Sequence, residues 1–309
     1  PGLIDLHFHG CIGADFCDGS REALEKISTY EASVGVTTIA PATMTLPTTE
    51  LEQILANAAE YQKNPAPGAD LVGINMEGPF ISASKKGAQA EENILHCDYE
   101  YFCRLQKAAK GLIKLVDLAP EEPGLVKFIG IAPEESEDAV SFIKEVKDEV
   151  HVSLAHTNAD YDTALAAFQA GADHAVHLYN AMPPFTHRAP GVVGAAADCE
   201  HVWAELICDG VHIHPATVRA TFKMLGDDRI VLISDSMRAT GMPDGVYTLG
   251  GLDVQVKGNR ATLVSDGALA GSVTNLMDCM RTAVKKMDIS LESAVKCATI
   301  NPARCLGID

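Results

Sequence analysis

Imidazole and carboxylate side chains recur along this chain, each close to the end of a short apolar run. Six of them stand out: His7 and His9 in DLHFHG, Glu77 in INMEGPF, His156 in SLAHTNAD, His177 in HAVHLYNAM and Asp235 in LISDSM. Imidazole and carboxylate groups together suit zinc or iron(II), and the absence of a thiolate argues against a closed structural zinc site. The sequence therefore predicts an open catalytic site that holds one or two divalent ions.

The six residues divide into roles by type and position. Glu77, His156 and His177 supply three ligands and leave one position for water, whose pKa a divalent ion lowers toward neutrality. His7 and His9 alternate onto the same face of a strand and could hold a second ion, bridged by Glu77. Asp235 is then suited to accept the proton of the water and to return it to a leaving group. A further metal ligand or a helix cap is the alternative role for Asp235.

Short β-branched apolar runs alternate with segments of helical period, a rhythm that predicts a parallel sheet. Eight runs, the number that closes a (β/α)₈ barrel, are expected as strands: Leu3–His7, Val36–Ala42, Leu71–Glu77, Leu112–Leu118, Val152–His156, His174–Leu178, Trp203–Cys208 and Ile230–Asp235. The expected helices are Arg21–Ser33, Thr48–Gln62, Tyr99–Ala109, Glu137–Lys147, Tyr161–Ala170, Pro215–Leu225, Leu276–Met287 and Leu291–Thr299. Because barrel enzymes carry their reacting groups at the carboxyl ends of the strands, we expect the six residues on one rim.

Two stretches depart from this rhythm. GLIKLVDLAPEE, from Gly111, and GLVKFIGIAPEE, from Gly124, are near copies, and either fits the fourth strand. Residues 245–265 alternate and turn at Gly-Gly and Gly-Asn, which predicts a β-hairpin insertion after strand eight. We therefore expect an α/β fold, a metal-dependent hydrolase type of TIM barrel over residues 1–309 with a hairpin at 245–265.

The charge balance limits the partners. Twenty-four Lys and Arg residues against 42 Asp and Glu residues give a net charge of −18, which repels phosphate backbones and anionic membranes. Nucleic acid and membrane are therefore not expected as partners, and no apolar run approaches the length of a membrane span. The nine scattered cysteines contain no CxxC pair, which fits a reducing cytoplasm.

Longer motifs carry a family resemblance. HxH after the first strand, MEGPFI, AHTNADYD, HLYNAMPPFTHRAPG, CDGVHIHP and SDSMRATG follow one another in this order. Together they resemble the N-acetylglucosamine-6-phosphate deacetylases of the amidohydrolase superfamily over essentially the whole chain. The resemblance implies hydrolysis of the acetamide of N-acetylglucosamine 6-phosphate to glucosamine 6-phosphate and acetate, in amino-sugar catabolism and cell-wall recycling. It gives Glu77, His156 and His177 to the main ion and makes Asp235 the general base and acid.

The resemblance also implies the substrate contacts. Asn180, Ala181, His212 and Arg188 would bind substrate, chiefly its phosphate. Arg188 would reach into the site of a neighbouring subunit, so a homodimer is implied. Gln89 stands where some relatives carry a histidine that helps to polarise the carbonyl, and its amide can donate a hydrogen bond but cannot act as an acid. The HxH pair together with Gln89 favours two ions, since relatives with one ion tend to lack that pair.

Members of this family flank the barrel with strands from both ends that form a small β-sandwich, and we expect that domain to be largely absent from this chain. Two rival interpretations stay open. One is another amidohydrolase, such as a dihydroorotase-like enzyme or another N-acyl deacetylase; many of these bridge two ions with a carboxylated lysine at the end of strand four, where neither Lys114 nor Lys127 falls. The other is a non-catalytic phosphosugar-binding protein, which would need a missing base or ligand.

Overall fold

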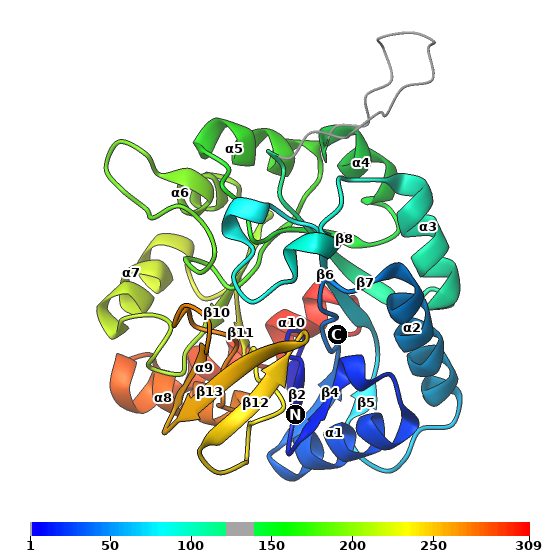
Figure 1. Ribbon diagram of the computed structural model, residues 1–309. Coiled ribbons are helices and arrows are strands. Elements are labelled where there is room, and N and C mark those ends of the chain that lie inside the picture. The colour runs from blue at the N-terminus through cyan, green and yellow to red at the C-terminus, as the bar shows by residue number, and fades with distance from the viewer. Residues whose placement is uncertain (1, 122–138) are drawn as a thin grey trace, which may run out of the picture.

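The candidate residues are held in place by parallel strands that close into a barrel (Figure 1). This computed structural model describes residues 2–121 and 139–309. Two hydrogen-bonded sheets, β1-β4-β5 and β11-β10-β9-β8-β7-β6, form the wall. Their bounds are β1 Leu3–Asp5, β4 Val36–Ile39, β5 Asp70–Leu71, β6 Ile74–Phe80, β7 Ile113–Leu118, β8 His151–Leu154, β9 His174–Ala175, β10 Trp203–Ile207 and β11 Ile230–Ile233. β5 pairs with β4 and β6 pairs with β7, so these two segments together make the third strand of the predicted eight.

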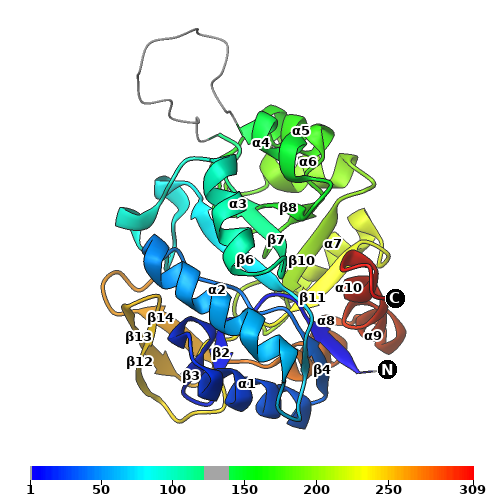
Figure 2. The same cartoon turned by 90° about the vertical axis from the view of Figure 1, so that its right-hand side faces the viewer.

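Two contacts close the ring between the sheets. Ala42 and Asn75 form a parallel bridge, and the backbone N–H of Asp235 donates to the carbonyl of His7 at 2.9 Å. The helices surround this wall (Figure 2), and the predicted α/β barrel is confirmed. The described helices are α1 Arg21–Ser33, α2 Thr48–Lys63, α3 Tyr99–Ala108, α4 Ala139–Val146, α5 Tyr161–Ala170, α6 Gly191–Asp198, α7 Pro215–Leu225, α8 Leu276–Met287, α9 Leu291–Cys297 and α10 Ile300–Cys305.

Side-chain caps explain why many helix starts were readable. Ser20, Asp98, Asp160, Asn275 and Ser290 each accept a hydrogen bond from the backbone N–H three residues later, which satisfies a donor that the helix itself leaves unpaired. The predicted helix starts therefore agree with the structure at all five. The predicted helix over 137–147 begins on residues outside the described part of the chain.

Two helices had no usable signal in the sequence. α6 is GVVGAAAD, an apolar stretch with two helix-weakening glycines and no polar face, and α10 is INPARC, which contains a proline. Both were missed because packing, rather than propensity or periodicity, makes them helical.

The predicted strands run too far at their carboxyl ends. β8, β9 and β11 each end two residues before His156, His177 and Asp235, respectively. These three residues have φ angles of 44°, 31° and 48°, in the left-handed region that side chains other than glycine rarely adopt. A left-handed residue cannot continue a strand, so the wall stops short of each. Such backbone strain gathers at functional sites, where the surrounding structure holds it in place.

The fourth strand is formed by the first of the two near copies, as β7. Lys114 is its second residue and so lies near the amino end, as expected. The copy that begins at Gly124, with Lys127, lies outside the described residues. Among the helices of the described segments, none combines the length and apolarity that a membrane crossing needs.

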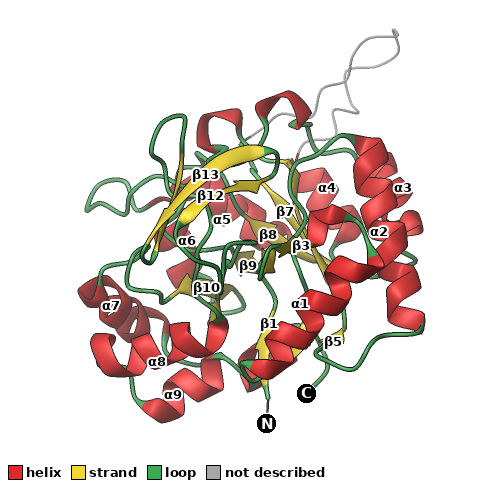
Figure 3. Ribbon diagram, turned by 60° about the horizontal axis from the view of Figure 1, so that its bottom comes forward, coloured by secondary structure: helices red, strands yellow, loops and turns green. Residues whose placement is uncertain are grey.

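The insertion after β11 is larger than one hairpin. It forms three antiparallel strands, β12 Gly245–Leu249, β13 Leu252–Lys257 and β14 Arg260–Leu263, with turns at the predicted Gly-Gly and Gly-Asn pairs (Figure 3). Alternate residues of this sheet face a small apolar cluster of their own, which includes Leu249, Val254 and Val256. A second hairpin, β2 Gly10–Cys11 with β3 Ala14–Asp15, follows β1 and was not predicted.

Candidate active site

Glu77 lies at the centre of the predicted metal ligands. It comes from β6, and its Oε1 atom is 3.1 Å from Nε2 of His156 and 3.4 Å from Nε2 of His177. The two Nε2 atoms are themselves 3.1 Å apart. All three side chains are buried. The structure therefore brings together the three residues that the sequence analysis assigned to the main ion.

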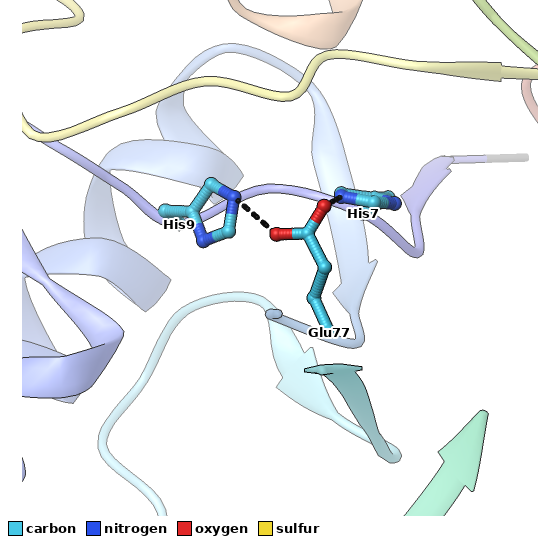
Figure 4. Close-up of side chains that lie close together, drawn as sticks. All are labelled: His7, His9 and Glu77. Atoms are coloured by element: carbon cyan, nitrogen blue, oxygen red, sulfur yellow. Dashed lines mark ion pairs between the residues drawn. The ribbon is translucent and has the colours of Figure 1, made fainter. Parts of the chain in front are cut away.

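His7 and His9 complete a second group around the same carboxylate. Oε1 of Glu77 is 3.4 Å from Nε2 of His7, and Oε2 is 3.3 Å from Nε2 of His9. Figure 4 shows the carboxylate between the two imidazole rings, with one oxygen turned toward each. Glu77 thus belongs to both groups, which is the arrangement that a bridging ligand needs.

The donor atoms fit a divalent metal ion. Ligands bound tetrahedrally at 2.0–2.1 Å lie about 3.3 Å from one another, close to the spacing of the Glu77, His156 and His177 atoms. Nδ1 of His156 lies 2.9 Å from the carbonyl of Lys85, and donation of its proton there leaves the Nε2 lone pair free for a metal. The buried Nε2 atom of His7 has no hydrogen-bond partner within the protein, so its lone pair is available to a metal ion.

The charges at this site follow from these contacts. Burial disfavours ionisation of the Glu77 carboxyl, but contacts with three imidazole rings outweigh burial and hold its pKa well below the usual range. Burial likewise opposes ionisation of Asp235, and the contact with His9 outweighs it, so the pKa of Asp235 is also lowered. Both carboxyl groups are therefore anionic at neutral pH and complement a cation.

Asp235 lies beside the ligands and lines an open cavity. Its Oδ1 atom is 3.5 Å from Nε2 of His9. The cavity has a volume of about 360 Å³, and its lining includes His9, Glu77, His156, His177 and Asp235. A substrate in this cavity therefore meets the proposed base and the metal ligands at the same wall.

Four of the five predicted substrate residues line the same cavity: Gln89, Asn180, Ala181 and His212. Nδ1 of His212 is 2.7 Å from Oδ2 of Asp209, whose other oxygen accepts the backbone N–H groups of Val211 and His212. Burial disfavours the charged form of His212, but the Asp209 contact outweighs burial and raises its pKa. The contact therefore favours the cationic form of His212, which suits an anionic part of a ligand. Asp209 was missed in the sequence, although its position three residues before His212 was a usable signal.

Gln89 lines the cavity but is engaged with the protein. Its Nε2 atom donates to Oε2 of Glu77 at 2.8 Å, and its Oε1 atom accepts the backbone N–H of Thr45 at 2.7 Å. The side chain is buried. Gln89 therefore orients the shared carboxylate, a role that the sequence analysis did not anticipate, and its predicted contact with substrate stays a prediction.

Arg188 is the predicted substrate residue that the structure does not bring to the cavity. It lies in the exposed loop before α6, where its Nη1 atom contacts Nε2 of His187 at 2.6 Å. The side chain of Phe185 in the same loop is 50% exposed. An exposed guanidinium on a projecting loop is compatible with a role outside its own subunit, which stays a prediction.

The sequence analysis also missed Glu205. This residue lies in the buried run AELI of β10, and its Oε2 atom is 3.1 Å from Nδ1 of His7. A single carboxylate within an otherwise apolar strand was the available signal, since a buried charge requires a partner.

Comparison with known proteins places this geometry in a family. The amidohydrolase family matches residues 1–309. The N-acetylglucosamine-6-phosphate deacetylase of Bacillus subtilis (strain 168) is 40% identical over 312 residues, which cover 100% of this chain and 75% of the relative. The N-acetylgalactosamine-6-phosphate deacetylase of Escherichia coli O157:H7 is 36% identical over 100% of this chain and 78% of the relative.

Solved structures agree. A mutant N-acetyl-D-glucosamine-6-phosphate deacetylase from Mycobacterium smegmatis, in complex with N-acetyl-D-glucosamine-6-phosphate, has a TM-score of 0.90 and is 31% identical. That match covers 100% of this chain and 77% of the other. The Mycobacterium smegmatis structure and this chain therefore share the same fold. The chain belongs to the amidohydrolase family and, within it, to the N-acetylglucosamine-6-phosphate deacetylases.

Proposed function

We propose that this protein hydrolyses the acetamide of N-acetylglucosamine 6-phosphate to glucosamine 6-phosphate and acetate, in amino-sugar catabolism and cell-wall recycling. The observation that carries the proposal is the shared wall of the cavity, where Glu77, His156 and His177 converge beside Asp235. A divalent ion held there supplies Lewis-acid chemistry, which polarises a carbonyl and lowers the pKa of water. The family relationship supports the same reaction class.

Asp235 is the proton carrier in this proposal. Its carboxylate lines the cavity beside the ligands, and its lowered pKa keeps it in the anionic form, the form that can accept a proton from water. Expulsion of the sugar requires a protonated amine, and Asp235 can return the same proton to that nitrogen. One carboxylate thus serves both halves of the reaction.

The phosphate would be bound away from the ligands. His212, whose cationic form the contact with Asp209 favours, would supply one charge, and Asn180 and Ala181 line the same cavity. Arg188 would supply a second charge from the partner subunit of a homodimer. A guanidinium fork binds phosphate oxygens in a bidentate manner, which offsets the repulsion from a chain of net charge −18.

A specific observation favours a second substrate. One relative, 36% identical, is an N-acetylgalactosamine-6-phosphate deacetylase. The two sugars differ in the orientation of one hydroxyl, whereas the acetamide and the phosphate are shared. Deacetylation of N-acetylgalactosamine 6-phosphate is therefore the alternative activity, carried out by the same ligands and the same base.

Acetate release measures both activities. Purified protein is incubated separately with N-acetylglucosamine 6-phosphate, N-acetylgalactosamine 6-phosphate, unphosphorylated N-acetylglucosamine and dihydroorotate. We expect the highest kcat/KM with the first compound, and a higher value with the second would reassign the sugar. Turnover of dihydroorotate alone would identify a different amidohydrolase, and binding without turnover of any compound would identify a phosphosugar-binding protein.

The cofactor and setting are part of the proposal. Zinc or iron(II) suits the imidazole and carboxylate donors, with one or two ions in each subunit. A cytoplasmic location agrees with nine cysteines that form no disulfide. Metal quantification on protein purified without chelator identifies the ion, and light scattering determines whether the protein is a dimer.

A further inference from the structure

Glu205 contacts one residue of each group of proposed metal ligands, His7 and His177. This carboxylate, buried on β10, faces the barrel interior, and its Oε2 atom lies 3.1 Å from Nδ1 of His7. The same oxygen is 3.4 Å from the backbone nitrogen of His177. Neither contact takes part in the proposed reaction.

The contact fixes where the proton of His7 lies. A carboxylate accepts, so Nδ1 of His7 carries the hydrogen that it donates to Glu205, and the lone pair is left on Nε2. That Nε2 atom faces Oε1 of Glu77 at 3.4 Å and has no hydrogen-bond partner. A carboxylate behind a metal-binding imidazole selects the tautomer, orients the ring and raises the basicity of the ligand atom.

Asn75, on β6, lies against the same nitrogen. Its Nδ2 atom is 3.3 Å from Nδ1 of His7, and its buried Oδ1 atom has no hydrogen-bond partner. An amide N–H at this place competes with Glu205 for Nδ1, whereas the reversed amide lets Oδ1 accept the same hydrogen and gives it the partner it lacks, so the proposed tautomer requires the reversed orientation. The ring of His7 is therefore held between Glu205 and Asn75 on one edge and Glu77 on the other.

His9 lacks comparable support. Its Nε2 atom faces Glu77 and Asp235, but its buried Nδ1 atom has no partner. Of the two histidines that would bind the second ion, only His7 has a fixed tautomer in the structure. The affinity of the second metal position therefore depends on the residues that hold His7.

We propose that Glu205 is a positioning residue that sets the tautomer and orientation of His7, and thereby the occupancy of the second metal position formed with His9 and Glu77. This inference rests on the proposed metal-dependent function. It predicts that loss of Glu205 weakens the second ion far more than the first. The first is held by His156, His177 and Glu77, and among the described residues Glu205 forms no hydrogen bond or ion pair with these side chains and reaches only the backbone nitrogen of His177.

The test is a Zn²⁺ titration of the metal-free protein against a competing chelator. We expect wild-type protein to bind two ions. Glu205→Met, which removes the acceptor, is expected to lower the affinity for the second ion by about 10–100-fold, the loss typical of an outer-shell partner. Glu205→Gln retains an acceptor oxygen and is expected to lose less. The first ion is expected to keep its affinity in both variants.

Two controls separate positioning from general damage. Asp117→Asn changes another buried carboxyl group of the barrel, one close enough to interact with His7 and Glu77 through its charge but without a hydrogen bond to His7, and is expected to lower the affinity for the second ion much less than Glu205→Met does. In a His7→Gln background, Glu205→Met is expected to cause no additional loss, because its effect passes through His7. Unfolding temperatures of the metal-free variants show whether each remains folded.

The outcomes decide the inference separately from the enzymatic activity. Unchanged affinity for the second ion in Glu205→Met, an equal loss at both ions, or a single ion in the wild type would overturn it. Failure to release acetate while the second-ion affinity still falls as expected would refute the proposed substrate and leave the role of Glu205 intact.

Discussion

The two ends of the barrel each carry a cluster of histidine and carboxylate groups, and the clusters differ in how their hydrogen bonds are used. At the carboxyl end, buried ring nitrogens of His7, His9 and His177 have no partner. At the amino end, Nδ1 of His151 is 2.6 Å from Asp173, which in turn lies 3.3 Å from Nδ1 of His174.

The series of side-chain contacts at the amino end of the barrel ends in the apolar core. Nε2 of His174 contacts Sγ of Cys305 at 3.1 Å, and Cys305, on α10, packs with Leu115, Ile207 and Val231 inside the barrel. No buried polar atom of His151, Asp173, His174 or Cys305 lacks a partner. The residue types at the two ends are nearly the same. Imidazole and carboxylate groups that line a cavity and leave buried ring nitrogens unpaired indicate a binding site, whereas a chain of satisfied contacts indicates a structural role.

Loss of a metal ligand is the largest expected effect and tests the carboxyl end. His156→Ala removes one of the three proposed donors to the main ion, and a Lewis acid contributes several kcal/mol to the transition state. We expect the protein to lose its main ion and turnover to fall by at least about a thousandfold. His174→Ala at the amino end is the matched control and should retain both the metal and turnover. Comparable metal loss in the two variants would abolish the distinction between the ends.

Asp235→Asn tests the proton carrier without removing a donor from the main group. The amide preserves shape but cannot accept the proton of water, so kcat is expected to fall by about 10²–10⁴-fold. Metal content, measured on the same sample, should stay at the wild-type value. If the ion were lost together with activity, Asp235 would act chiefly as a ligand, in line with its contact to His9.

Arg188→Ala tests whether the carboxyl-end site extends across a subunit interface. Loss of a charge-assisted hydrogen bond to phosphate is expected to raise KM for the phosphorylated sugar by about 10–100-fold. KM for unphosphorylated N-acetylglucosamine should not change. Equal effects on the two sugars would show that Arg188 does not contact phosphate. Mixed dimers of Arg188→Ala and Asp235→Asn subunits should regain about one fully competent site, if the arginine acts in the partner.

The smallest expected effect is at the amino end and depends on pH. Burial favours the neutral form of Asp173, but contacts with two histidines outweigh it and lower its pKa; the contact with Asp173 likewise outweighs burial at His151 and raises that pKa. The contribution of Asp173 is lost as pH falls below about 4, and that of His151 is lost as pH rises above about 6.5. The pair therefore stabilises the fold most between these values.

Asp173→Asn measures this contribution. We expect it to lower the free energy of unfolding by about 1 kcal/mol near pH 5.5, discounted for the partial exposure of both side chains, and by less at pH 3 and pH 9. Denaturant unfolding at the three pH values provides the comparison, and turnover at pH 7 should equal that of the wild type. A loss that is independent of pH would exclude the ion pair as its cause.

The sequence predicted the fold and the members of the carboxyl-end group for a common reason. Parallel strands deliver their carboxyl ends to one rim, so residues that follow successive strands must meet there. His156, His177 and Asp235 could be placed in this way without knowledge of any side-chain contact. The residues at which the strands end could not be predicted, because the left-handed backbone of these three residues is imposed by the packed site.

Roles that depend on contacts across the barrel came only with the tertiary structure. The amide of Gln89 bonds Glu77, Glu205 bonds His7 across an intervening strand, and Asp209 holds His212. Residue types and their order along the chain determined which groups reach the rim, since strand direction follows from local pattern. Which nitrogen of each ring remains free is decided by neighbours distant in sequence, because a hydrogen bond requires an atom within about 3 Å and the folded barrel alone creates that proximity.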